Sequence, residues 1–136
     1  LGVQRVPREA TASYGIVKPA GADDGKLVEV AGLVEKPKPA DAPSDLGVVG
    51  RYILTPEIFH QLAKTGRGAG GEIQLTDGIA RLLDVEKVLA YRFAGKRYDC
   101  GSKLGYLEAT VDFALTHQHL GKEFTDFLKS RAAQFD

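Results

Sequence analysis

The sequence contains very little sulfur, with one cysteine, Cys100, and no methionine in 136 residues. A single cysteine cannot form an internal disulfide, and this usage fits a reducing cytoplasm best. The chain also lacks an early apolar run that resembles a signal peptide or a membrane span. These absences predict a cytoplasmic protein that does not act in a membrane.

The chain has no excess of charge of either sign, because eighteen Lys and Arg residues balance eighteen Asp and Glu residues. This balance removes the electrostatic argument for non-specific binding to nucleic acid or to a membrane surface. An anionic ligand must therefore be met by a local group of residues. The length is usual for one domain and can bury a useful core, so one compact unit is expected.

The pattern of apolar and turn-forming residues predicts a mixture of strands and helices. Short β-branched or alternating segments predict strands at residues 12–18, 27–35, 46–54 and 88–93. The first two strands are expected to be neighbours, joined by a turn at 21–25. Helix starts and apolar spacing predict helices at residues 55–64, 73–83, 102–115 and from 121 onwards, the first capped by the Thr55 hydroxyl.

Glu35 and Lys36 place a carboxylate beside an ammonium directly before Pro37. Neighbouring side chains of a regular strand point to opposite faces, so the pair can serve one ligand only if the strand ends or bulges there. The carboxylate can then accept hydrogen bonds from sugar hydroxyls, while the lysine supplies a mobile charge for phosphate. The alternative is that both are solvated residues at a strand end.

Asp99 lies where an extended segment ends and a helix begins, just before Gly101. Open α/β sheets place ligand groups at such positions, and a glycine lets the backbone come close. The carboxylate can hold Mg²⁺ through oxygen, or it can cap the helix that starts near Ser102. Both interpretations remain open, as they do for Lys103, which can meet either phosphate or solvent.

Three further groups carry weaker signals. The glycine-rich residues 66–71 lack the lysine-serine or lysine-threonine ending of a P-loop, which favours a mobile surface loop. His117 and His119 lie two apart on an expected helix and so on different faces, which argues against a shared metal. Cys100 has no histidine partner nearby in sequence, which favours a packed thiol over a nucleophile.

Five blocks of sequence, in order, cover nearly the whole chain: residues 12–17, 33–37, 49–54, 70–77 and 98–106. They include Val-Glu-Lys-Pro, Glu-Ile-Gln-Leu-Thr-Asp and Asp-Cys-Gly-Ser-Lys-Leu-Gly-Tyr. Together they closely resemble the bacterial UTP–glucose-1-phosphate uridylyltransferases. The last block is more similar to the glucose uridylyltransferases than to the related thymidylyl or adenylyl enzymes.

The resemblance implies an α/β fold that is part of a Rossmann-like nucleotidyltransferase, with a mixed sheet flanked by helices and ending in C-terminal helices. Residues 1–136 would be the C-terminal portion of a single nucleotidyltransferase domain, on its sugar-phosphate side. The glycine-rich nucleotide loop and early metal-binding aspartate of the family's N-terminal half have no counterpart before Tyr14. The chain by itself is therefore expected to be catalytically silent.

The activity that the resemblance implies is transfer of a uridylyl group from UTP to glucose 1-phosphate, which yields UDP-glucose and pyrophosphate with Mg²⁺. The sugar phosphate is itself the nucleophile, so the protein has to align reactants and neutralise charge. The rivals are a nucleotidyltransferase for another sugar phosphate and a non-catalytic module that binds sugar nucleotides.

The resemblance also assigns residues. Gly15 would contact the sugar through its backbone, Glu35 would accept sugar hydroxyls, and Lys36 would be the catalytic residue that contacts the phosphates. Asp99 would hold the metal. Because the family is commonly oligomeric, a homo-oligomer is expected. Phe124 and Phe127 are candidates for its interface, with core packing as the alternative.

Overall fold

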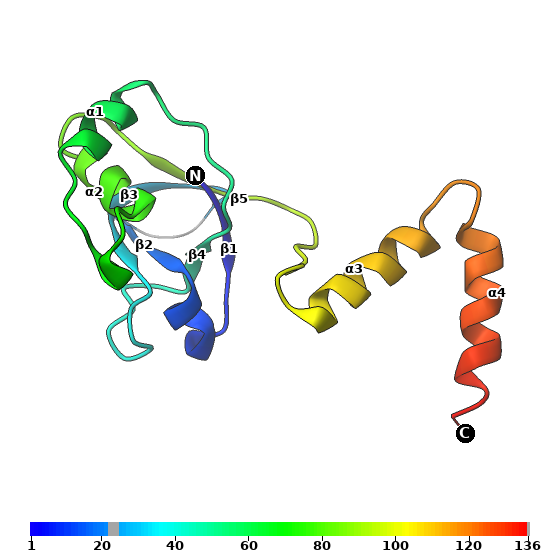
Figure 1. Cartoon of the computed structure of the whole chain (residues 1–136). Coiled ribbons are helices and arrows are strands. Elements are labelled where there is room, and N and C mark those ends of the chain that lie inside the picture. The colour runs from blue at the N-terminus through cyan, green and yellow to red at the C-terminus, as the bar shows by residue number, and fades with distance from the viewer. Residues whose placement is uncertain (22–24, 136) are drawn as a thin grey trace. The chain divides into compact units, whose positions relative to one another are not determined.

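A mixed sheet organises the first part of the chain (Figure 1). The computed structural model describes residues 1–21 and 25–135, and within them five strands close on one another in the order β1-β4-β2-β3-β5. Neighbouring strands are antiparallel except β1 and β5, which are parallel. The strands are β1 (Gly2–Arg5), β2 (Gly15–Pro19), β3 (Leu27–Glu35), β4 (Leu46–Val48) and β5 (Leu89–Arg92).

The described chain divides into two compact units, Leu1–Ala94 (unit 1) and Gly95–Asp136 (unit 2). The expectation of one compact unit was wrong, because the length of a chain does not reveal such a division. Helices α1 (Glu57–Ala63) and α2 (Leu75–Leu82) accompany the sheet in unit 1, with the 3₁₀ turns η1 (Arg8–Ser13) and η2 (Ala69–Gly71). Unit 2 contains α3 (Lys103–Leu115) and α4 (Gly121–Ala132). The expected mixed sheet with helices, ending in C-terminal helices, is confirmed.

The core of unit 1 lies where α1 and α2 pack together and α2 packs on β3 (Figure 1). Burial of an aliphatic side chain stabilises a fold by about 1.5–3 kcal/mol, so this layer holds α2 firmly against the sheet. The buried residues are Val3, Val17, Val30, Leu46, Val48, Ile58, Ile79, Leu82, Val88 and Ala90.

The predicted pairing of the segments around residues 15 and 35 is confirmed. β2 and β3 are antiparallel, and their register pairs Gly15 with Glu35 and Ile16 with Val34. The strand predicted at 27–35 has the bounds of β3. Of the turn predicted at 21–25, residues 22–24 lie outside the described residues. The register places Gly15 directly beside the carboxylate that the sequence singled out.

Three sequence expectations were wrong in detail. Residues 8–13 form the turn η1, so β2 begins at Gly15 rather than at residue 12. β4 ends at Val48, before Gly50 takes a φ of 74° that an extended strand cannot continue through. The Thr55 hydroxyl does not cap α1, because it donates to the Glu86 carboxylate at 2.8 Å and Pro56 occupies the cap position.

The strand β1 was missed altogether. Its four residues are too few to show an alternating pattern, and β1 exists through its pairing with β4 and β5. Tertiary pairing of this kind leaves no local signal in the sequence.

Unit 2 is built on a turn and two helices. Asp112 of α3 accepts hydrogen bonds from Lys96 and from the Tyr98 hydroxyl, which ties the helix to the segment before it. Both hydrogen bonds lower the pKa of the Asp112 carboxyl, and the bond from Lys96 has the larger effect. The apolar spacing that predicted a helix over 102–115 does not produce a buried apolar face on α3, because Leu104 and Leu107 are exposed. No helix in the described part of the chain has both the length and the apolar character to cross a membrane.

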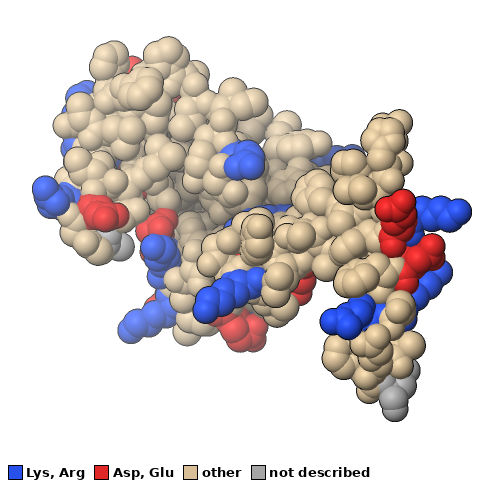
Figure 2. Space-filling view, turned by 45° about the vertical axis from the view of Figure 1, so that its right-hand side comes forward, with Lys and Arg blue, Asp and Glu red and all other residues tan. Residues whose placement is uncertain are grey.

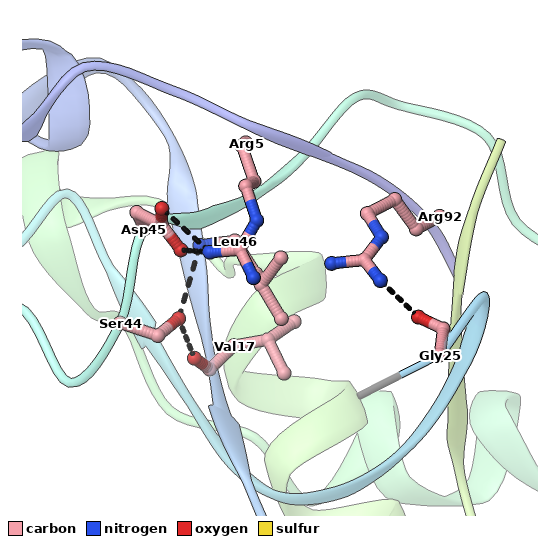
Figure 3. Close-up of polar contacts among 7 residues, drawn as sticks. All are labelled: Arg5, Val17, Gly25, Ser44, Asp45, Leu46 and Arg92. Carbon is pink, nitrogen blue, oxygen red and sulfur yellow. Dashed lines mark hydrogen bonds and ion pairs between the residues drawn. The ribbon is translucent and has the colours of Figure 1, made fainter. Parts of the chain in front are cut away.

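Ser44 connects two strands of the sheet (Figure 3). Its hydroxyl donates to the Val17 carbonyl at 2.5 Å and accepts from the Leu46 amide at 3.0 Å. The neighbouring Asp45 forms an ion pair with Arg5 at 2.6 Å, with both side chains well exposed. The Ser44 hydroxyl bonds to buried backbone groups, whereas the Arg5–Asp45 ion pair is largely solvated. The Ser44 contacts should therefore contribute more to the free energy of unfolding than the ion pair does.

We predict that Ser44→Ala lowers the free energy of unfolding by about 1–3 kcal/mol, because it leaves two backbone groups without their partner. Asp45→Asn is the matched control and should cost less than about 1 kcal/mol. Urea unfolding followed by circular dichroism measures both. Equal losses in the two variants would contradict this account of the sheet.

Candidate functional site

The end of β3 carries the most distinctive backbone feature of the chain. Lys36 has a φ of 46°, and among the described residues other than glycine it alone has a positive φ. Its amide still donates to the Tyr14 carbonyl at 3.0 Å, so the chain turns while the hairpin remains paired. Pro37 follows and is buried. The left-handed conformation costs a non-glycine residue about 1–2 kcal/mol, which the surrounding contacts offset.

Glu35 and Lys36 can serve one ligand only if the strand ends or bulges at this point, and the turn at Lys36 meets that condition. The strand ends at Glu35, and the Lys36 ammonium lies 3.8 Å from Glu35 Oε1. The two charged groups therefore lie together instead of on opposite faces. The Glu35 side chain is 14% exposed and that of Lys36 is 57% exposed, so the carboxylate is sheltered and the ammonium reaches solvent.

Gly15 lies buried against the same carboxylate. A Cβ at this position would come within 3.1 Å of both Glu35 Oε2 and Thr76 Oγ1, closer than most Cβ contacts. Thr76, in the first turn of α2, donates its hydroxyl hydrogen bond to Glu35 Oε2 at 2.5 Å. The structure thus brings Gly15, Glu35 and Lys36 together and adds Thr76 to them.

Tyr52 is coupled electrostatically to Glu35. Burial raises the pKa of its phenol, and the Glu35 carboxylate raises it further. Sequence reasoning assigned no role to Thr76 or Tyr52, although both lie in the quoted blocks 70–77 and 49–54. We call Gly15, Glu35, Lys36, Tyr52 and Thr76 the β3-end cluster.

Asp99 belongs to unit 2 and is described there by itself. It is exposed, and its Oδ1 accepts the Gly101 amide at 3.0 Å. The cap of α3 is Ser102, whose hydroxyl accepts the Gly105 amide at 3.0 Å. Asp99 therefore shapes the turn before the helix, while Ser102 provides the cap that the sequence left open for Asp99.

Gly105 is a constraint that sequence reasoning did not notice. A Cβ there would overlap the Asp99 carbonyl oxygen, so the first turn of α3 packs directly on the backbone of this turn. Within the described residues, no three His, Cys, Asp or Glu side chains form a group able to hold a metal. Mg²⁺ in nucleotide sites commonly takes only one or two carboxylates together with phosphate oxygens, and an exposed Asp99 fits one such ligand.

The structure also shows where the residues with weaker sequence signals lie. Cys100 is exposed, so the expectation of a packed thiol was wrong. His117 and His119 lie in the connection between α3 and α4 rather than on a helix, where the His119 amide donates to His117 Nδ1 at 3.3 Å. The glycine-rich segment is at the surface as expected, and the Arg67 side chain donates to the Gly71 carbonyl at 2.8 Å.

The aromatic pair on α4 is partly accessible. Phe124 is half-buried and Phe127 is 54% exposed, with ring centroids 6.0 Å apart. Neither residue is fully buried within unit 2. Their assignment to a subunit interface stays a prediction.

Charge is mixed on the molecular surface. On the face drawn in Figure 2, basic and acidic side chains are interspersed among larger areas of other residues. This agrees with the balanced composition. On this face an anion would have to be met by individual side chains rather than by a patch of one sign.

Comparison with known proteins shows the family of the chain. Residues 2–115 match the family model described as nucleotidyl transferase. The chain belongs to the nucleotidyl transferase family. The match runs through unit 1 and across α3, so it includes the β3-end cluster as well as Asp99.

Within the nucleotidyl transferases, the chain is similar to enzymes that act on glucose 1-phosphate. It is 46% identical over 129 residues to the UTP–glucose-1-phosphate uridylyltransferase of Bacillus subtilis, covering 95% of this chain and 44% of that protein. It superimposes with a TM-score of 0.81 on UTP-bound UDP-glucose pyrophosphorylase from Acinetobacter baumannii, at 45% identity over 94% of this chain and 44% of that one.

A second solved structure is UDP-glucose pyrophosphorylase complexed with UDP-glucose, which gives a TM-score of 0.76 at 42% identity. That match covers 82% of this chain and 42% of the other. The chain thus spans less than half the length of these relatives. It is homologous to UTP–glucose-1-phosphate uridylyltransferases over part of their length.

The backbone at Lys36 generates a prediction that is independent of ligand. The free energy of unfolding of Lys36→Gly should be about 0.5–1 kcal/mol higher than that of Lys36→Ala, because glycine adopts a φ of 46° without strain. Both variants lose the ammonium, so the difference reports the backbone alone. Denaturant unfolding followed by circular dichroism measures it.

Glu29, inside β3, is the matched control. There the order should reverse, with Glu29→Ala more stable than Glu29→Gly by about 0.5–1 kcal/mol. If glycine is the less stable replacement at residue 36 as well, the strained turn is not a feature of the folded protein.

Proposed function

We propose that this chain supplies the sugar-phosphate side of a UTP–glucose-1-phosphate uridylyltransferase. The observation that carries the proposal is the turn at Lys36, which puts a sheltered carboxylate and an accessible ammonium 3.8 Å apart beside the buried Gly15. A carboxylate suits the hydroxyls of a sugar, and an ammonium suits its phosphate. The names of the relatives, and the UDP-glucose and UTP in their structures, support the choice of substrates.

The proposed reaction joins glucose 1-phosphate to the α-phosphorus of UTP and releases pyrophosphate. The sugar phosphate oxygen is the nucleophile, so the chain has to orient it and lower the repulsion between two anions. The Glu35 carboxylate accepts hydrogen bonds from the sugar hydroxyls, and the Gly15 backbone lies against the sugar. Lys36 contacts the phosphates and is the catalytic residue of this proposal.

Mg²⁺ is the cofactor of this proposal, with Asp99 as one of its ligands. When bound, the cation neutralises charge on the reacting phosphates. The exposure of Asp99 and its place in a tight turn before α3 support this role. The turn holds the carboxylate through the Gly101 amide and leaves oxygen lone pairs for other partners.

The remaining assignments also stay proposals. The chain spans less than half of its relatives, and we propose that it corresponds to the C-terminal portion of a single nucleotidyltransferase domain. UTP and UDP-glucose are then ligands of the whole enzyme, which we propose to be a cytoplasmic homo-oligomer.

The chain is predicted to bind glucose 1-phosphate, measured by isothermal titration calorimetry. Lys36→Ala should weaken the binding of glucose 1-phosphate and of inorganic phosphate by about tenfold or more each, since a charged hydrogen bond contributes about 1.5–3 kcal/mol. Glu35→Ala should weaken only the binding of the sugar phosphate. Lys38→Ala, a nearby exposed lysine, is the control and should bind both as the unaltered chain does.

The outcomes of this titration distinguish the proposed function from its alternatives. Preference for a different hexose 1-phosphate would favour a nucleotidyltransferase for another sugar. Loss of phosphate binding in Glu35→Ala, or no loss in Lys36→Ala, would contradict the division of roles between the two residues.

A separate prediction concerns the metal. With Mn²⁺ in place of Mg²⁺ and glucose 1-phosphate present, paramagnetic broadening in nuclear magnetic resonance spectra should centre on the amides of residues 99–102. Asp99→Asn should abolish it, while Asp84→Asn, another exposed acid, should not. Broadening that persists in Asp99→Asn would remove Asp99 from the proposed metal site.

A further inference from the structure

We infer that Thr76 is a positioning residue that orients the Glu35 carboxylate toward the sugar, an inference that rests on the proposed function. The Thr76 hydroxyl donates to Glu35 Oε2 at 2.5 Å, across a separation of 41 residues. Charge-assisted bonds between hydroxyl and carboxylate have this short length and are stronger than neutral ones. The bond therefore fixes one oxygen of Glu35 in a defined direction.

The two oxygens of Glu35 have different neighbours. Oε2 faces the Thr76 hydroxyl, and Oε1 faces the Lys36 ammonium at 3.8 Å. A carboxylate has about four acceptor positions, so the ones left open by Thr76 are available to hydroxyl donors. Because the carboxylate is held from one side, those acceptor positions point in a fixed direction relative to Lys36.

The backbone around the pair leaves little room for another arrangement. Gly15 lies so close that a Cβ would come within 3.1 Å of both Glu35 Oε2 and Thr76 Oγ1. Three elements thus meet here: the start of β2, the end of β3 and the first turn of α2. α2 is fixed in turn by the buried Ile79 and Leu82. The core of unit 1 therefore supports the direction in which Glu35 faces the sugar.

A purely structural role for Thr76 has a different consequence. If the hydroxyl only satisfied a sheltered carboxylate, its removal would lower stability and affect every ligand alike. A positioning role instead affects the part of the ligand that Glu35 recognises. Comparing glucose 1-phosphate with inorganic phosphate separates the two, because inorganic phosphate has no sugar hydroxyls.

The experiment is calorimetric titration of the 136-residue chain with these two probes. Thr76→Val should weaken the binding of glucose 1-phosphate about tenfold and change that of inorganic phosphate less than twofold. Thr76→Ser, which keeps the hydroxyl, should bind glucose 1-phosphate within about threefold of the unaltered chain. Thr65→Val is the control, since the Thr65 hydroxyl donates to the Gln61 carbonyl; it should leave both affinities unchanged.

The double variant gives the decisive comparison. In a Glu35→Ala background, Thr76→Val should cause no additional loss, because the residue acts through Glu35. If Thr76→Val is too unstable to measure, Thr76→Ala serves instead, since it removes the same hydroxyl donor and should cause the same selective loss.

Each outcome has a distinct meaning. Unchanged binding of glucose 1-phosphate by Thr76→Val, or a loss that persists in the Glu35→Ala background, overturns the inference and leaves the proposed function standing. An unaltered chain that binds inorganic phosphate but not glucose 1-phosphate overturns the proposed function, and the inference falls with it.

Discussion

The turn at Lys36 is the constraint on which the candidate site depends. The hairpin of β2 and β3 remains paired up to the Lys36 amide, and the chain then leaves the sheet through a left-handed residue and a buried proline. A strand that continued straight would separate the two charged groups onto opposite faces. The strained backbone is what brings a sheltered carboxylate and an accessible ammonium together.

In the proposed site, Glu35 is held in place by its neighbours, whereas Lys36 is open to solvent. Glu35 is held by Thr76 and crowded by Gly15, and α2 behind it is anchored in the core. Lys36 is mostly exposed and keeps the rotamer freedom of a long side chain. Fixed acceptors suit the directional hydroxyls of a sugar, whereas a mobile cation can follow a phosphate as charge redistributes during transfer.

Local sequence signals predicted the parts of the structure that local forces decide. The bounds of β3, its pairing with β2 and the condition on Glu35 and Lys36 followed from alternation and a single proline. Thr76 could not be assigned, because its partner is 41 residues away and only the tertiary fold brings them together. Its one sequence signal was membership of the Glu-Ile-Gln-Leu-Thr-Asp block. The apolar spacing in α3 shows the same limit, since periodicity predicts a helix and not the burial of its side chains.

The central claim is that Glu35 recognises the sugar and Lys36 the phosphate of one glucose 1-phosphate molecule, and a crystal structure of the chain with that ligand tests it most directly. The account predicts sugar hydroxyls within hydrogen-bond distance of Glu35 and the phosphate within reach of the Lys36 ammonium, with the Thr76 bond intact. A sugar phosphate bound with its hydroxyls away from Glu35, or with the phosphate on other residues, would contradict it.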